Sequence, residues 1–200
     1  MIKIRLFSRK PNFTQVVLGV LYLLCSLSSQ AATNVSGNVF GTWTLTGSPY
    51  LVTNVIQVAG GQSLTIEPGV EVIFQGFYRF IVNGQLKVIG NAAMPVTFKA
   101  QDTTGWYNDA VSTGGWRGIQ FNAYQGAGPD SSIISFALIQ DVKHGVNANA
   151  NGFNALGISN RTMLISNTEL THNQSTHNLS DGRIIQIYNT GNFEVTMQDC

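Results

Sequence analysis

Apolar and polar residues alternate in short runs along most of the chain. In residues 63–76, SLTIEPGVEVIFQG, one alternating run ends at Ile66 and a second begins at Val70. Strict alternation is typical of β-strands with one buried face, so this segment predicts two strands interrupted by residues 67–69. The rest of the chain after residue 31 shows no run of apolar residues at helical spacing.

The interruption has the composition of a turn. Pro68 fixes φ for the second position of a type II turn, and Gly69 provides the positive φ required at the third. Type II turns splay antiparallel strands, whereas hairpins prefer the mirror-image types. Residues 67–70 therefore predict a corner at which the chain leaves one sheet and enters another.

The strands recur at nearly constant spacing. The motif VIF at 72–74 is followed by VTF at 96–98 and IQF at 119–121, at intervals of 24 and 23 residues. LTI at 64–66 is followed 22 residues later by LKV at 86–88. Two strand types with one period predict a coil in which each turn adds a strand to at least two sheets. We expect Phe74, Phe98 and Phe121 to stack in one internal ladder.

A looser repeat continues toward the C-terminus. ALIQD at 137–141, TELTH at 168–172 and VTMQD at 195–199 align at intervals of 31 and 27 residues. The alignment predicts two columns, an apolar one of Ile139, Leu170 and Met197 and a polar one of Asp141, His172 and Asp199. A carboxylate–imidazole–carboxylate column can perform acid–base chemistry. The alternative is a polar column at a corner of the coil, which is an ordinary feature of stacked folds.

These features resemble a known superfamily. Residues 48–100 and the segment GWRGIQF at 115–121 resemble the opening of right-handed parallel β-helix proteins of the pectin-lyase-like superfamily, in particular exported bacterial ones. The resemblance is strong over 41–121 and more generic over 131–200. It implies an all-β, single-stranded, right-handed parallel β-helix, a solenoid whose rungs cannot bury their inner faces alone.

The resemblance leaves the activity open. The superfamily includes polysaccharide lyases, glycoside hydrolases, adhesins and virulence factors, and fold alone does not select among them. The paired aspartates and GHG motif of pectin-hydrolysing members are absent, and KHGV at 143–146 matches only a fragment. Asp181 and Arg183 could hold a sugar carboxylate or close a surface loop.

The first 31 residues predict a signal peptide. Lys3, Arg5, Arg9 and Lys10 precede an apolar core at 16–27, and small residues follow up to Ala31. An uncleaved membrane anchor is the alternative. Residues 32–50 are expected to form an N-terminal cap or first strand, and 51–200 to form rungs that continue in a longer protein. We expect a secreted or cell-surface protein without a membrane span in the mature chain.

Charge and cysteine content limit the kinds of partner and crosslink that we expect for the mature chain. Four of the eleven Lys and Arg lie in the leader, which leaves seven against ten Asp and Glu, a net charge of −3. No basic stripe remains, so we expect no nucleic-acid binding. Cys25 lies in the leader, and Cys200 alone cannot form an intrachain disulfide. A polysaccharide or a surface protein is the expected partner.

Aromatic residues give the candidate ligand contacts. Trp106 and Tyr107 lie in a long loop, and Tyr124 follows the strand at 119–121. Such rings can stack on sugars, or the loop can fold back so that Trp106 covers a rung. Trp116 is expected to be structural.

Metal binding is a weaker prediction. Asp102, Asn108 and Asp109 offer oxygen ligands for Ca²⁺, although a turn-forming loop explains them equally. His172 and His177 are five residues apart and point to opposite faces of an extended strand, so no shared metal site is expected.

The leading functional hypothesis is a non-catalytic, adhesin-like protein that presents loops and a ladder face to glycans or proteins. The rivals are a polysaccharide lyase or glycoside hydrolase of the same fold, and a structural spacer for a downstream domain.

Overall fold

The computed structural model describes residues 31–108, 111–127, 130–143, 155–173, 185–190 and 193–200. All of them belong to one unit, Ala31–Cys200. The leader lies outside the described residues, so the signal-peptide and membrane-anchor hypotheses stay predictions. No helix in the described part of the chain has the length and hydropathy to cross a membrane.

The described chain consists of short strands and one 3-10 turn, η1 (Leu45–Gly47). The strands are β1 (Thr33–Asn38), β2 (Gly41–Trp43), β3 (Tyr50–Val58), β4 (Ser63–Ile66), β5 (Glu71–Phe74), β6 (Phe80–Val82), β7 (Gln85–Ile89), β8 (Val96–Ala100), β9 (Ile119–Phe121), β10 (Ile133–Ser135), β11 (Ala137–Gln140), β12 (Leu156–Ser159), β13 (Met163–Ser166), β14 (Glu169–Thr171), β15 (Ile185–Tyr188) and β16 (Val195–Gln198).

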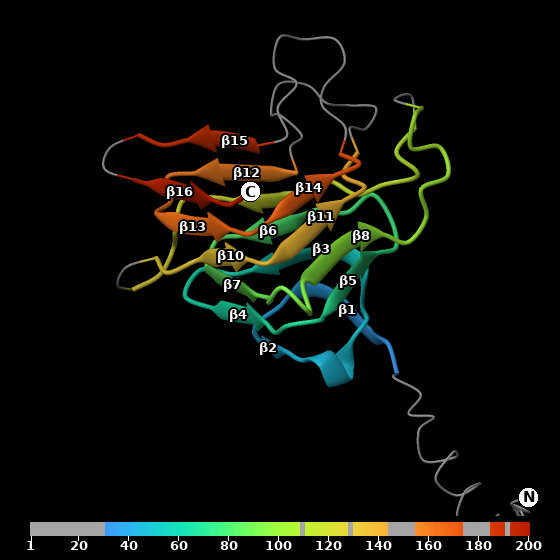
Figure 1. The fold of residues 1–200 in the computed structure, drawn as a ribbon, viewed down its shortest axis with the longest axis horizontal. Helices are drawn as coiled ribbons and strands as arrows, with labels where there is room; N and C mark the ends of the chain where they lie inside the picture. The colour runs from blue at the N-terminus through green and yellow to red at the C-terminus, as the bar shows by residue number, and fades with distance from the viewer. Residues whose placement is uncertain (1–30, 109–110, 128–129, 144–154, 174–184, 191–192) are drawn as a thin grey trace, which may run out of the picture. The chain divides into compact units, whose positions relative to one another are not determined.

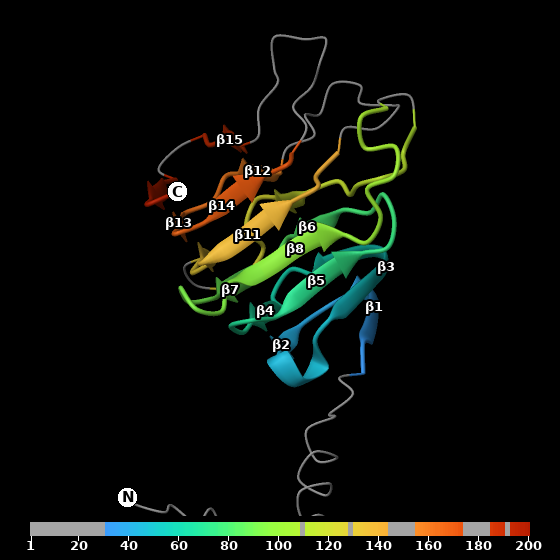
Figure 2. The ribbon, with the colours of Figure 1, turned by 45° about the vertical axis from the view of Figure 1, so that its right-hand side comes forward.

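The strands stack into parallel ladders. The first ladder is a six-stranded sheet, β2–β4–β7–β10–β13–β16, which rises from the bottom to the top of Figure 1. In the ten-stranded sheet, β3 pairs through Tyr50–Val52 with β5 and through Ile56–Val58 with β6. It therefore contains a second ladder, β3–β5–β8–β11–β14 (Figure 2), and a third, β3–β6–β9–β12–β15.

After β3, which belongs to both the second and the third ladder, each complete turn of the described chain adds one strand to each ladder. For example, β4, β5 and β6 are followed in order by β7, β8 and β9. All pairs between these named strands are parallel. The fold is therefore an all-β parallel β-helix, as the sequence predicted.

The core is built from the inward residues of the alternating pattern. Leu64 pairs in register with Leu86, and Ile66 pairs with Val88, which in turn pairs with Ile134. All five side chains are fully buried. Neighbouring strands lie about 4.8 Å apart, so each inward residue packs on the same position of the next turn. Burial of one such side chain contributes about 1.5–3 kcal/mol.

Residues 67–70 form the predicted corner. Gly69 has φ of 77°, and the Val70 N–H donates to the Glu67 carbonyl at 3.4 Å. The strand before this turn, β4, belongs to the first ladder, and β5 after it belongs to the second. The turn at residues 67–70 thus carries the chain from the first ladder to the second.

At several later corners, a single non-glycine residue with positive φ turns the chain. Phe136 and Asn167 make the step from the first to the second ladder, and Asn160 ends β12. The asparagines at these corners agree with the tolerance of Asn for left-handed backbone. Asp141 and His172, with φ of 63° and 50°, occupy the corner after the second ladder.

The predicted phenylalanine ladder is wrong. Phe98 pairs with Val72 rather than with Phe74, and Phe121 pairs with Val82 in the third ladder. The turns between these strands differ in length, so an equal spacing in the sequence does not give an equal position in the coil. Trp116 instead stacks on Phe74, with ring centroids 3.9 Å apart.

The alignment of the late repeats is correct in part. Ile139 pairs with Leu170, as predicted. Met197 does not continue this column, because β16 belongs to the first ladder and Met197 pairs with Ile165. Asp199 consequently follows a strand of a different ladder from those that precede Asp141 and His172.

Candidate functional site

A long loop at the corner after the second ladder begins the candidate site. The chain leaves β8 at Ala100 and returns to the coil at Trp116, which is fully buried. The Trp116 indole N–H donates to the Gln140 carbonyl at 2.7 Å. Trp116 is therefore structural, as expected, and it anchors the returning arm of the loop.

Lys143 holds the two arms of the loop together. Its side chain is fully buried, and its ammonium donates to the carbonyls of Gly105 and Thr113 at 2.5 and 2.6 Å. Gly115 allows this close approach, because a Cβ at that position would lie 2.5 Å from the Lys143 Cβ. A buried ammonium needs such partners to offset the loss of hydration.

The outgoing arm is ordered by a local turn. The Thr104 N–H donates to the Asp102 carboxylate at 2.8 Å. Hydrogen bonds from the Thr104 hydroxyl and backbone N–H hold the pKa of Asp102 below its usual value. The structure thus gives Asp102 a role in the turn.

Calcium binding by Asp102, Asn108 and Asp109 stays a prediction, and Asp109 lies outside the described residues. Among the described residues, no group of three or more His, Cys, Asp or Glu side chains is arranged to hold a metal ion.

Asp141 and His172 form a hydrogen-bonded pair beside the loop. The His172 Nδ1 lies 2.6 Å from the Asp141 Oδ1, and the other Asp141 oxygen accepts from the Ala100 N–H at 3.3 Å. The Asp141 side chain is 9% exposed and that of His172 is 41% exposed. The carboxylate is fixed in the corner, and the imidazole that it orients reaches solvent.

The loop brings its aromatic residues onto this imidazole. The Trp106 ring stacks on His172 with centroids 3.9 Å apart and planes 18° apart. Tyr107 meets Trp106 edge-on, at 4.9 Å and 87°, and remains 85% exposed. Two candidate groups that the sequence suggested separately, Trp106 with Tyr107 and Asp141 with His172, therefore form one cluster. We call these four residues the aromatic corner.

Tyr124 does not belong to the aromatic corner. It is half-buried, and its ring lies 5.3 Å from the guanidinium carbon of Arg161. Its position indicates a packing role. The residues His177, Asp181 and Arg183 lie outside the described part of the chain.

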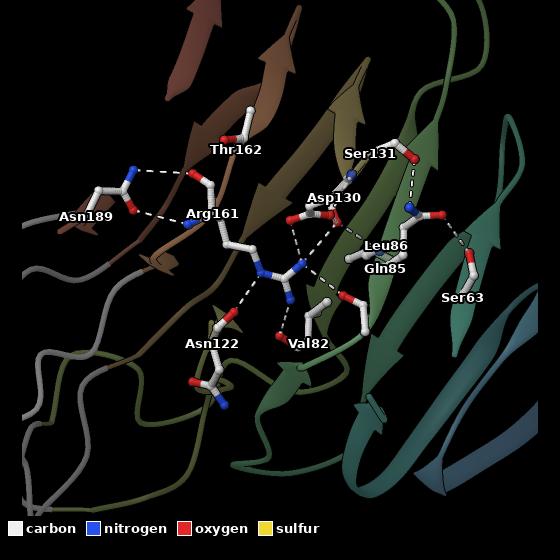
Figure 3. Close-up of polar contacts among 12 residues, drawn as sticks. Ser63, Val82, Gln85, Leu86, Asn122, Asp130, Ser131, Arg161, Thr162 and Asn189 are labelled. Atoms are coloured by element: carbon white, nitrogen blue, oxygen red, sulfur yellow. Dashed lines mark hydrogen bonds and ion pairs between the residues drawn. The ribbon is translucent and has the colours of Figure 1, made fainter. Parts of the chain in front are cut away.

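Arg161 is the principal charged residue that the sequence analysis missed (Figure 3). Its side chain is 0% exposed and pairs with Asp130 at 2.7 Å. It also donates to the carbonyls of Val82, Gly84 and Asn122 at 2.6–2.8 Å. These acceptors belong to two earlier turns of the coil. An arginine in an ordinary polar segment, before strand β13, gives no sequence signal of this role.

Comparison with known proteins gives a limited relationship. The chain is 38% identical over 60 residues to "Protein bark beetle" of Drosophila melanogaster, a match that covers 30% of this chain and 2% of that protein. The chain thus corresponds to a small part of that relative. No protein-family model matches the chain, and no solved structure matches it.

Proposed function

We propose that this chain is a non-catalytic, exported, adhesin-like β-helix protein of the pectin-lyase-like superfamily, which binds glycans at the aromatic corner. The single observation that carries the proposal is the arrangement of two rings at a right angle, Trp106 and Tyr107, on a loop that Lys143 holds in shape. Export rests on the leader sequence alone.

The two rings provide complementary surfaces for a sugar. Tyr107 offers a ring with 85% exposure, on which the C–H face of a sugar can stack. Trp106 is held by its stacking on His172 and forms a wall beside that ring. The imidazole and hydroxyl groups at the corner can bond to sugar hydroxyls. Because Trp106 is already held against His172, less ordering is needed on binding.

The alternative is a polysaccharide lyase or glycoside hydrolase, and the Asp141–His172 pair is the observation that favours it. A carboxylate that orients an imidazole is a familiar arrangement for a general base. A glycosidase also needs a second carboxyl group across the cleaved bond. Of the four residues of the aromatic corner, Asp141 carries a carboxylate, which is nearly buried, and Asp102, on the loop that carries Trp106, accepts a hydrogen bond from the Thr104 N–H.

Binding of the purified protein to an array of bacterial and plant glycans would test the proposal. Tyr107→Ala should weaken binding of a retained glycan about two- to tenfold, since an aromatic stacking contact contributes about 0.5–1.5 kcal/mol beyond area burial. Phe40→Ala is the matched control, because Phe40 is 64% exposed on an earlier turn of the coil. The same weakening in both variants would contradict the site.

The same glycans should be assayed for turnover with and without Ca²⁺. Binding without product supports the proposal, whereas release of unsaturated sugars or reducing ends would replace it with the enzyme hypothesis. An absence of any binding would favour the structural spacer.

A further inference from the structure

A groove on the outer face of the first ladder is separate from the aromatic corner. Its volume is about 610 Å³, and it lies between two columns of outward side chains. One column contains Lys87, Ile133, Leu164 and Thr196, which pair in register on β7, β10, β13 and β16. The other contains Ser131, Thr162 and Glu194, of which Thr162 accepts from the Glu194 N–H at 3.4 Å.

The rim of the groove is held by hydrogen bonds and an ion pair within the protein. Asp130 lines it with a side chain that is only 6% exposed, and Arg161 holds the carboxylate at 2.7 Å. Ser132 donates to the other Asp130 oxygen and accepts from the Leu86 N–H. Ser131 accepts from the Gln85 amide at 2.7 Å. A preformed rim reduces the entropy lost on binding.

The groove is apolar in its middle and oppositely charged at its ends. Most of its exposed lining is apolar, and Ile133 and Leu164 are half-buried there. Lys87 lies at one end, and the described residues provide it with no ion-pair partner. Glu194 lies at the opposite end, three turns of the coil away.

These dimensions fit a short extended peptide. Three steps of about 4.8 Å between turns span about 14 Å, the length of about four residues at about 3.3 Å each. The lining includes no aromatic ring on which a sugar could stack. Ser131, Thr162 and Thr196 add hydroxyl groups to the lining, and a hydroxyl can hydrogen-bond to the backbone of an extended chain.

We propose that this groove binds an extended segment of a partner protein with the order acidic, aliphatic, aliphatic, basic along its length. The acidic residue contacts Lys87, the aliphatic pair covers Ile133 and Leu164, and the basic residue contacts Glu194. This site is independent of the aromatic corner, so either can fail without the other.

Two capped peptides test the proposal, the charged acetyl-Asp-Leu-Val-Lys-amide and its uncharged counterpart acetyl-Asn-Leu-Val-Gln-amide. NMR titration of the purified protein should show a preference of about fivefold for the charged peptide, the size expected for two exposed ion pairs. The double variant Lys87→Gln with Glu194→Gln should abolish the preference. The matched control exchanges the ion pair on the second ladder, Glu71→Lys with Lys99→Glu, and should leave the preference unchanged.

Equal binding of both peptides by the wild-type protein would overturn the proposal, as would an unchanged preference in the Lys87/Glu194 variant. Failure of both peptides to bind at millimolar concentration would also overturn it. If the double variant unfolds, Lys87→Gln alone should reduce the preference about twofold, and no reduction counts against the groove. Displacement of the peptide by a neutral oligosaccharide would assign the groove to glycans instead.

Discussion

Two corners of the coil each pair a carboxylate with a basic side chain from the next turn, yet they differ in access to solvent. Asp130 and Arg161 are 6% and 0% exposed, whereas Asp141 and His172 are 9% and 41% exposed. In both, the carboxylate is fixed by protein contacts. The difference lies in the basic partner, which is enclosed in the first corner and open in the second.

The comparison separates a structural pair from one that a ligand can reach. Arg161 donates from all three guanidinium nitrogens to protein acceptors, so the side chain is committed to the coil. His172 contacts Asp141 through Nδ1 and Trp106 through one face of its ring, and the remainder is exposed. Of the two pairs, the one at the aromatic corner has a basic partner that a ligand can reach.

Removal of the enclosed cation should have the largest effect. Arg161→Met leaves the Asp130 carboxylate buried without its cationic partner and removes one donor from each of three carbonyl groups. Loss of one partner of a buried pair costs about 3–5 kcal/mol, so the free energy of unfolding should fall by that amount. Urea denaturation followed by circular dichroism measures it.

Adding Asp130→Asn to Arg161→Met should restore part of this stability, because the double variant no longer buries an unpaired charge. Lys99→Met is the control at a partly exposed ion pair, where the expected loss is below about 1 kcal/mol. A loss of that small size for Arg161→Met would show that the Asp130–Arg161 pair does not stabilise the coil.

Local sequence patterns predicted the features that depend on neighbouring residues. The alternation around Leu64 and Val72, and the turn chemistry of Pro68 and Gly69, were sufficient to place two strands and a corner between them. The motifs at 137–141 and 168–172 also predicted that Asp141 and His172 lie on adjacent turns. In each case, the determining contacts lie within one turn or between equivalent positions of adjacent turns.

Features that depend on loop path could not be predicted in this way. Arg161 bonds to carbonyls 77 and 79 residues earlier in the chain, which no local pattern links to it. The register of Phe98 and Phe121 depends on how much chain each turn extrudes. Stacking of Trp106 on His172 likewise depends on the position of the loop segment 101–108, which Lys143 contacts from a later turn.

A smaller loss of stability is expected for a change at the aromatic corner. Asp141→Asn keeps a side chain that tolerates positive φ and can still accept from the Ala100 N–H. The loss of unfolding free energy should be about 1 kcal/mol, the value of one hydrogen bond.

Glycan affinity of Asp141→Asn should change little, because Asp141 is nearly buried beneath His172. Titration of a retained glycan against both proteins measures this. A complete loss of turnover in Asp141→Asn, if turnover exists, would identify the pair as catalytic and end the contrast with binding alone.

The smallest effect is expected at the turn of Asp102 and Thr104, which begins the loop that carries Trp106 and Tyr107. Thr104→Ala removes the hydroxyl that lowers the pKa of Asp102, so this pKa should rise toward 3.8, as NMR titration of the carboxyl carbon would show. Because the folded pKa lies below the unfolded value, ionised Asp102 stabilises the turn above about pH 4, and this contribution disappears as the pH falls through the folded pKa. The pKa of Asp102 should not respond to Arg161→Met in protein that remains folded, since the two corners have no described contact in common. A change in the pKa of Asp102 in that variant would mean that the Asp130–Arg161 pair is coupled through the coil to the loop that begins at Asp102.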